Sequence, residues 1–293
     1  MKQAYTLLLL LIIFPALAWA LDPIQANPDT ILAYSQNRWR NSRYEVFQWQ
    51  DMAAIFSAPI LIFDTATYDV QNRLTKRLAF FVEKPDFNGH LLTDAELAPL
   101  NGWRAHDYKA DDLAAFFHTA ARTRFTLSRE ELELRELLLD TGIIRQAPAG
   151  GFIAGAGAIV SLSQESSRSL RYTHIVHECF HAIFFLDEDF RAFSRRRFEK
   201  LDPQAKRFIL AYFDYLGYDT SNDYLMVNEF MGYILQQPLS ETVSSFTNRA
   251  ITMRAGTKFG PLVELTRVFQ VEAEAFSAYV NQRWGLAAGK IQR

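Results

Sequence analysis

Apolar residues recur every three or four positions along several stretches of the chain, which is the spacing of one face of a helix. Between residues 69 and 84, Val70, Leu74, Leu78 and Phe81 follow this spacing. The same pattern, with capping residues before it and proline or glycine after it, predicts helices over residues 69–84, 111–121, 128–140, 170–186, 203–215, 223–237 and 261–284. We therefore expect a mainly helical protein.

Two short stretches are apolar without helical spacing and predict strands. Residues 59–63 are one of them, and the glycine-rich stretch 150–157 leads into the second, residues 158–162. A few strands among many helices favour an α+β fold. Because the character of the chain changes at the glycine-rich stretch, we expect a helical or mixed region of unknown role over residues 21–149 and a second region over residues 150–293.

The first twenty residues have the features of a cleaved signal peptide. Lys2 precedes an apolar run, and Ala18 and Ala20 stand where a signal peptidase requires small residues. A membrane anchor is the alternative, but the apolar run ends at Pro15 and is shorter than the roughly 20 residues of a spanning helix. We expect an exported protein, periplasmic or extracellular, that does not contact the membrane once the signal is removed.

Composition excludes several classes of protein. Of the 293 residues, 49% are hydrophobic and 14% aromatic, which is enough to build a dense core and excludes a disordered chain. The formal charge of -2 excludes the strongly basic surface that a nucleic-acid partner requires. The single cysteine, Cys179, cannot form a disulfide within the chain, and we expect it to be a buried thiol. The sequence does not define the oligomeric state.

The chemistry is concentrated in His177-Glu178-Cys179-Phe180-His181, which has the pattern H-E-x-x-H. On a helix, residues four apart lie on one face, so His177 and His181 can direct ring nitrogens at one ion. Glu178 lies beside that row, where its carboxylate can act as a general base on a metal-activated water. The pattern predicts one zinc ion per chain.

The residues around this motif are almost all apolar, which strengthens the prediction. Val176, Phe180 and Ile183 place the motif in a helix that is largely buried, where unpaired imidazole and carboxyl groups are destabilising. A metal ion removes that penalty, whereas the alternative is a cluster of histidines held by hydrogen bonds alone.

This helix resembles the active-site helix of the zincin metallopeptidases. The resemblance rests on about 60 residues between the glycine-rich stretch and Gln237, roughly a fifth of the chain. It implies a zinc-dependent peptidase with a zincin-like core over residues 150–293, a peptide or protein substrate, and a small sheet whose edge strand lies beside the active helix and pairs with the substrate. Residues 158–162 are where that edge strand would be, with an internal strand as the alternative.

Two histidines leave a catalytic zinc one protein ligand short. Glu229 is the favoured third ligand because it lies on an apolar helix face, and Asn228-Glu229 resembles the second-helix glutamate of the gluzincins. Its spacing of 48 residues from His181 is longer than in the best-known gluzincins. Asp187 corresponds to the last ligand of the metzincin pattern, but Phe184 replaces the glycine at which that pattern turns. Other acids remain alternatives, such as Asp214 and Glu264.

The roles of two further residues are open. Tyr233 lies one turn after Glu229 and could donate a hydrogen bond to the oxyanion of an intermediate, or could be an ordinary core tyrosine. His174 could support the site, line the cleft or simply cap the core. The sequence predicts an exported zinc metallopeptidase that uses Glu178 as general base. Two alternatives stay open: a non-catalytic zinc-stabilised binding protein, or a zinc amidohydrolase acting on a non-peptide or cell-wall amide.

Overall fold

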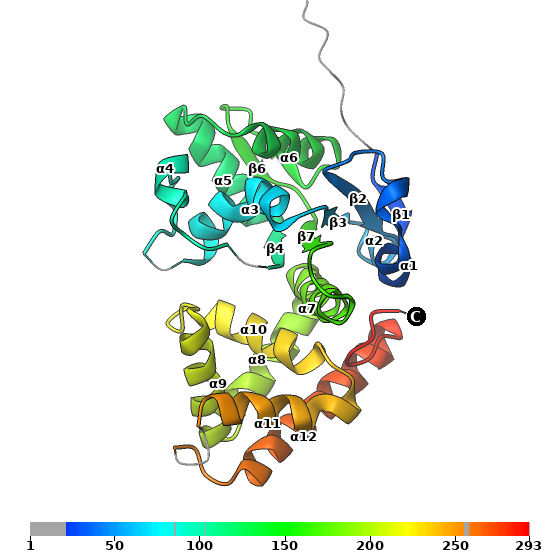
Figure 1. Ribbon diagram of the computed structural model, residues 1–293, viewed down its shortest axis with the longest axis vertical. Helices are drawn as coiled ribbons and strands as arrows, with labels where there is room; N and C mark the ends of the chain where they lie inside the picture. The colour runs from blue at the N-terminus through cyan, green and yellow to red at the C-terminus, as the bar shows by residue number, and fades with distance from the viewer. Residues whose placement is uncertain (1–21, 85, 103, 255–257, 293) are drawn as a thin grey trace, which may run out of the picture.

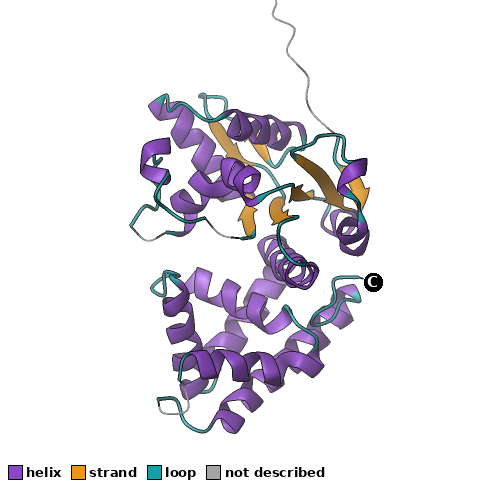
Figure 2. Ribbon diagram, in the orientation of Figure 1, coloured by secondary structure: helices purple, strands orange, loops and turns teal. Residues whose placement is uncertain are grey.

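The structure is a computed structural model that describes residues 22–292 apart from residues 85, 103 and 255–257. The predicted signal peptide, residues 1–20, lies outside the described residues and stays a prediction. The chain forms a part that contains the strands and a part built from helices alone, and α7 (Arg168–Leu186) lies between them (Figures 1 and 2). The prediction of a mainly helical α+β fold is confirmed.

Five strands form a mixed sheet. Its order is β1 (Ile24–Ala26), β2 (Tyr44–Trp49), β3 (Ile60–Thr65), β7 (Ala158–Ser163) and β4 (His106–Lys109). β7 pairs in parallel with β3 and antiparallel with β4, so β4 lies at the edge. A separate two-stranded sheet joins β5 (Ile144–Gln146) and β6 (Phe152–Ala154).

Alternate residues of the central strands supply two hydrophobic cores. Ile60 and Ile62 of β3 point into one core, and Leu61 and Phe63 point into the other. The second core lies under α3 (Tyr68–Glu83), α5 (Ala110–Thr123) and α6 (Arg129–Asp140). The first core packs the opposite face of the sheet on α7 and continues into the helical part. The sheet is therefore covered on both faces, and α7 is held between a sheet and a layer of helices.

The helical part follows α7 in the sequence. It contains α8 (Glu188–Glu199), α9 (Pro203–Leu216), α10 (Asp223–Leu235), α11 (Thr242–Thr252) and α12 (Leu262–Trp284). The short helices α1 (Pro28–Ala33), α2 (Gln50–Phe56) and α4 (Asp94–Leu97) lie between elements of the other part. All seven helices predicted from spacing are present, whereas α8, α11 and β2 were not predicted. Within the described residues, no helix has both the length and the apolar character needed to cross a bilayer.

Of the two alternatives for residues 158–162, the internal strand is confirmed and the edge strand is wrong. This stretch lies in β7, which is hydrogen-bonded on both sides and buried along its whole length. A continuous apolar run suits a strand covered on both faces, whereas β4 alternates between buried and half-buried residues. Because β7 lies between β3 and β4, the sheet also crosses the boundary expected near residue 150.

Candidate metal centre

Two histidine side chains of α7, those of His177 and His181, bring their ring nitrogens close together. The helix begins at Ser167, whose hydroxyl accepts a hydrogen bond from the backbone N–H of Leu170 at 3.3 Å. His177 and His181 are one turn apart, and their Nε2 atoms are 2.9 Å from each other. The His177 side chain is 10% exposed and that of His181 is 0% exposed. The motif therefore holds two buried nitrogen donors on a single helix face.

Glu229 of α10 completes a set of three donors. Its Oε2 is 3.6 Å from Nε2 of His177, and its Oε1 is 3.9 Å from Nε2 of His181. Ligands of a tetrahedral zinc ion, each about 2.0–2.2 Å from the metal, lie about 3.3–3.6 Å from one another. The three donor atoms are 2.9, 3.6 and 3.9 Å apart, so their separations lie on both sides of that range. A small shift of side chains would let all three bind one ion.

The unsatisfied polar atoms at this point also fit a cation. Oε2 of Glu229 is buried and has no hydrogen-bond partner among the described residues. Burial, together with a smaller effect of Asp107, raises the pKa of Glu229 to about 7. Burial lowers the pKa of His177 to about 4. His177 is therefore in the neutral form, which is the form of imidazole that binds a metal, and Glu229 is a carboxyl group that a positive ion would stabilise as the anion.

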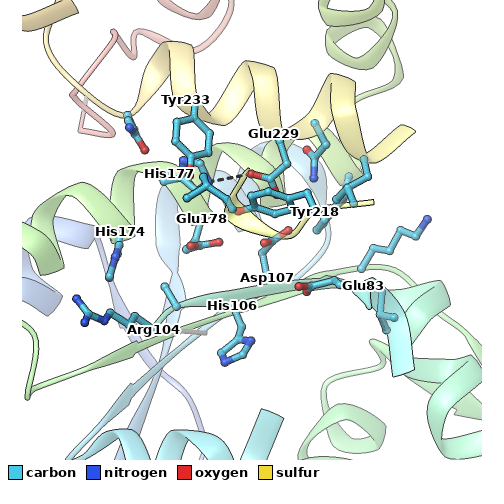
Figure 3. Close-up of a pocket in the computed structure, with 18 of the residues that line it drawn as sticks. Glu83, Arg104, His106, Asp107, His174, His177, Glu178, Tyr218, Glu229 and Tyr233 are labelled. Carbon is cyan, nitrogen blue, oxygen red and sulfur yellow. Dashed lines mark ion pairs between the residues drawn. The ribbon is translucent and has the colours of Figure 1, made fainter. Parts of the chain in front are cut away.

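Glu178 lies beside the donor row with its carboxylate directed toward the cavity (Figure 3). It is buried, and its side chain is within hydrogen-bond reach of Asp107. Burial is the main cause, and Asp107 the next, of a pKa well above the usual range of a glutamate. A carboxyl group in this position can take up a proton close to the three donors.

Asp107 lies in the site but was not among the candidate site residues. It is on β4, residues 106–109, a strand that the pattern of apolar residues did not predict. The side chain of Asp107 points toward Glu178, and their carboxylate oxygens and Nε2 or Nδ1 of His181 all lie within 4.8 Å of one another. In the strand, His106 and Tyr108 are buried, whereas Asp107 and Lys109 are half-buried, so Asp107 is on the less buried side of β4.

Asp107, His177, Glu178 and Glu229 line a cavity of about 630 Å³ between the edge strand and the helices. His174 lines it one turn before His177, and burial lowers its pKa to about 4. Tyr233 lines it from α10, with its ring 5.1 Å from that of His177 in an edge-to-face contact. Tyr218, which sequence reasoning did not single out, is within hydrogen-bond reach of both Glu229 and Tyr233.

The other candidate ligands lie elsewhere. Asp187 ends α7 and caps α8, with Oδ1 accepting a 2.7 Å hydrogen bond from the backbone N–H of Phe190. Its Oδ2 pairs with Arg283 at 2.8 Å. Asp214 and Glu264 are exposed and belong to no candidate metal cluster of the described residues. Cys179 is fully buried in the core, which raises the pKa of its thiol.

Comparisons with known proteins give no match. No protein-family model matches the chain, and neither a curated protein nor a solved structure is similar to it at a significant level.

Proposed function

We propose that this protein is a zinc-dependent hydrolase that cleaves peptide bonds. The observation that supports the proposal is the convergence of His177, His181 and Glu229 from two helices, with Glu178 beside them in a cavity. Zinc, when bound, polarises the substrate carbonyl and makes water a stronger nucleophile. Three donors and an adjoining cavity suit a catalytic site better than a structural one, which is closed by a fourth protein ligand.

The chain's own residues have separate roles in this proposal. Glu178 takes the proton of the attacking water and delivers it to the leaving amine. Tyr233 donates a hydrogen bond to the oxyanion. The outer edge of β4 is free of strand pairing among the described residues, so an extended peptide can pair with it as a further strand. Peptide pairing at this edge favours a peptide or protein substrate over a non-peptide amide.

The proposed setting is outside the cytoplasm, after removal of residues 1–20. The features that support it are Lys2, the apolar run that follows and the small residues Ala18 and Ala20. Fractionation of cells that express the full chain, with sequencing of the mature N-terminus, tests this proposal. Recovery of uncleaved chain in the cytoplasm would contradict it.

Metal content and turnover test the proposal together. Elemental mass spectrometry on the purified chain should find about one zinc per chain, and His177→Ala should lose it. Glu178→Gln should retain zinc but lose hydrolysis of a peptide library. Glu199→Gln is the matched control, because Glu199 is an exposed glutamate on α8.

The remaining outcomes separate the alternatives. Zinc without hydrolysis of any peptide, but with hydrolysis of non-peptide amides, would assign the site to an amidohydrolase. Zinc without any hydrolysis would assign it to a structural role. Retention of full activity by Glu178→Gln would contradict the proposed mechanism.

A further inference from the structure

We propose that Arg249 of α11 is a positioning residue for Tyr233: it holds the Tyr233 ring beside the metal donors and keeps a positive charge against that ring. The inference rests on the proposed function, in which Tyr233 donates a hydrogen bond to the oxyanion. Arg249 is not among the residues that line the cavity, so it would act through Tyr233 and not by touching the substrate.

The guanidinium group of Arg249 lies among aromatic rings. Its Cζ atom is 5.1 Å from the centre of the Tyr233 ring, 4.9 Å from that of Phe246 and 5.9 Å from that of Tyr212. A guanidinium within about 6 Å of a ring centre is attracted by the electrons of the ring face. The Tyr233 ring also contacts the His177 ring edge-to-face at 5.1 Å (Figure 3). Arg249 is therefore one ring away from a metal donor.

A chain of hydrogen bonds joins Arg249 to the backbone of Tyr233 as well. Nη1 of Arg249 donates to the hydroxyl oxygen of Ser245. That hydroxyl donates to Oε1 of Gln237 at 3.3 Å, and Nε2 of Gln237 donates to the backbone carbonyl of Tyr233 at 3.0 Å. The side chain and the backbone of Tyr233 are thus both connected to the same guanidinium group. Loss of that group would release the ring and the last turn of α10 together.

The charge of Arg249 is not neutralised locally. Among the described residues, Arg249 forms no ion pair with a carboxylate. Burial lowers its pKa, and the opposing effects come from Tyr212 and Tyr233. An arginine nevertheless stays protonated in proteins. A positive charge that is fixed beside the oxyanion donor, in a region from which water is excluded, stabilises negative charge as it develops.

The same charge also acts on the donor cluster. Burial is the main cause of the lowered pKa of His177, and Arg249 lowers it too. A charge that disfavours a protonated imidazole also repels a zinc ion, whereas it attracts an oxyanion. A purely structural arginine would support zinc binding and turnover alike. Zinc affinity and kcat therefore distinguish the two roles.

Kinetics of two variants test the inference. Arg249→Met removes the charge and the hydrogen bonds but keeps an unbranched side chain. Its kcat should fall by about tenfold or more while KM changes by less than about threefold, because Arg249 does not touch the substrate. Its zinc affinity, measured by competition with a chelator, should stay the same or rise. Arg249→Lys keeps the charge and should lose less kcat than Arg249→Met. Equal losses of kcat in the two variants, together with weaker zinc binding in both, would overturn the inference.

A double-mutant cycle tests whether Arg249 acts through Tyr233. In the Tyr233→Phe background, which already lacks the hydroxyl, Arg249→Met should lower kcat by less than about twofold. A loss of kcat as large as in the wild-type background would show that Arg249 acts independently of Tyr233, and would overturn the inference.

Fluorine NMR of the purified protein, labelled with fluorotyrosine, tests the position of the ring without turnover. The Tyr233 signal is the one absent from Tyr233→Phe. It should move or broaden in Arg249→Met and stay in place in the matched control Arg267→Met, because Arg267 is exposed on α12. A Tyr233 signal unchanged in Arg249→Met would overturn the inference. A wild type that hydrolyses no peptide would overturn only the proposed function.

Discussion

Gly232 of α10 lies directly against the ring of His181. A β-carbon built at Gly232 would be 2.8 Å from Cε1 and 2.9 Å from Nε2 of His181, and 2.8 Å from Cε1 of His177. Real β-carbons do not approach other atoms this closely. The absence of a side chain at this position therefore allows Glu229, one turn earlier on the same helix, to reach both imidazoles.

Gly232→Ala should weaken zinc binding by more than about tenfold, because the methyl group pushes both imidazoles away from Glu229. In an ordinary helix the same change stabilises by about 1 kcal/mol. Here we expect a loss of stability instead. Chelator competition measures the zinc affinity and thermal unfolding measures the stability. A more stable variant with unchanged zinc affinity would show that the helices do not need this close approach.

Tyr218→Phe should weaken zinc binding by about 10- to 100-fold, because the variant loses a hydrogen bond to the Glu229 carboxylate. Tyr215→Phe is the matched control, because Tyr215 lies on α9 and is 64% exposed. Zinc affinity is measured on both variants by competition with a chelator. Equal affinities would show that Tyr218 does not orient Glu229.

Tyr233→Phe should lower kcat by about 10²- to 10³-fold while zinc stays bound, because the oxyanion loses a hydrogen-bond donor. The ring also packs against Phe213 at 5.3 Å and lies under the guanidinium of Arg249 at 5.1 Å. Phenylalanine preserves those ring contacts and loses only the hydroxyl with its hydrogen bond to Tyr218, so the loss of stability should be small, about 1 kcal/mol. Steady-state kinetics with a peptide that the wild type hydrolyses test whether Tyr233 stabilises the oxyanion. An unchanged kcat would assign Tyr233 to packing.

Asp64 should make the protein more stable as the pH falls from 7 to 4. Burial raises its pKa from 3.8 to about 6 although Arg171 lies 2.7 Å away. Between these values the folded state binds a proton that the unfolded state does not, so this contribution is present at low pH and is lost as the pH rises through about 6. A shift of about two pKa units corresponds to about 3 kcal/mol.

Urea unfolding of the wild type and of Asp64→Asn checks this contribution. The free energy of unfolding of the wild type, minus that of the variant, should be larger at pH 4 than at pH 7. Asp69→Asn, which alters an exposed pair with Arg73, should show little such dependence. A difference independent of pH would show that Asp64 stays ionised beside Arg171 throughout.

Asp187→Ala should reduce the free energy of unfolding by about 0.5–2 kcal/mol through loss of the α8 cap, and should leave zinc binding unchanged. The pair with Arg283 adds little, because the guanidinium side chain is 40% exposed. Loss of zinc from this variant would instead revive the metzincin-type ligand set.

The elements predicted correctly are those whose signal is local. Helices such as residues 262–284 carry their apolar period within one segment, and capping residues mark their beginnings. His177, Glu178 and His181 were singled out because one helix places them together. Glu229 was singled out because a carboxylate stood on an apolar face.

The parts that were missed depend on contacts between distant segments. β4 has four residues, too few to carry a clear period, and its place at the edge is defined by pairing with β7. The apolar run 158–162 predicts a strand but not its neighbours. Asp107 and Glu178 come together only in the folded chain, so no spacing in the sequence relates them.

The central place of β7 has a consequence for the order in which the site is built. The strands on both sides of β7, residues 60–65 and 106–109, leave the ribosome before their shared neighbour is made. The helix with the histidines follows β7 directly, and Glu229 comes later still. A nascent chain that ends before residue 229 therefore lacks one of the three donors, so the cluster of His177, His181 and Glu229 can assemble only after most of the polypeptide has been made.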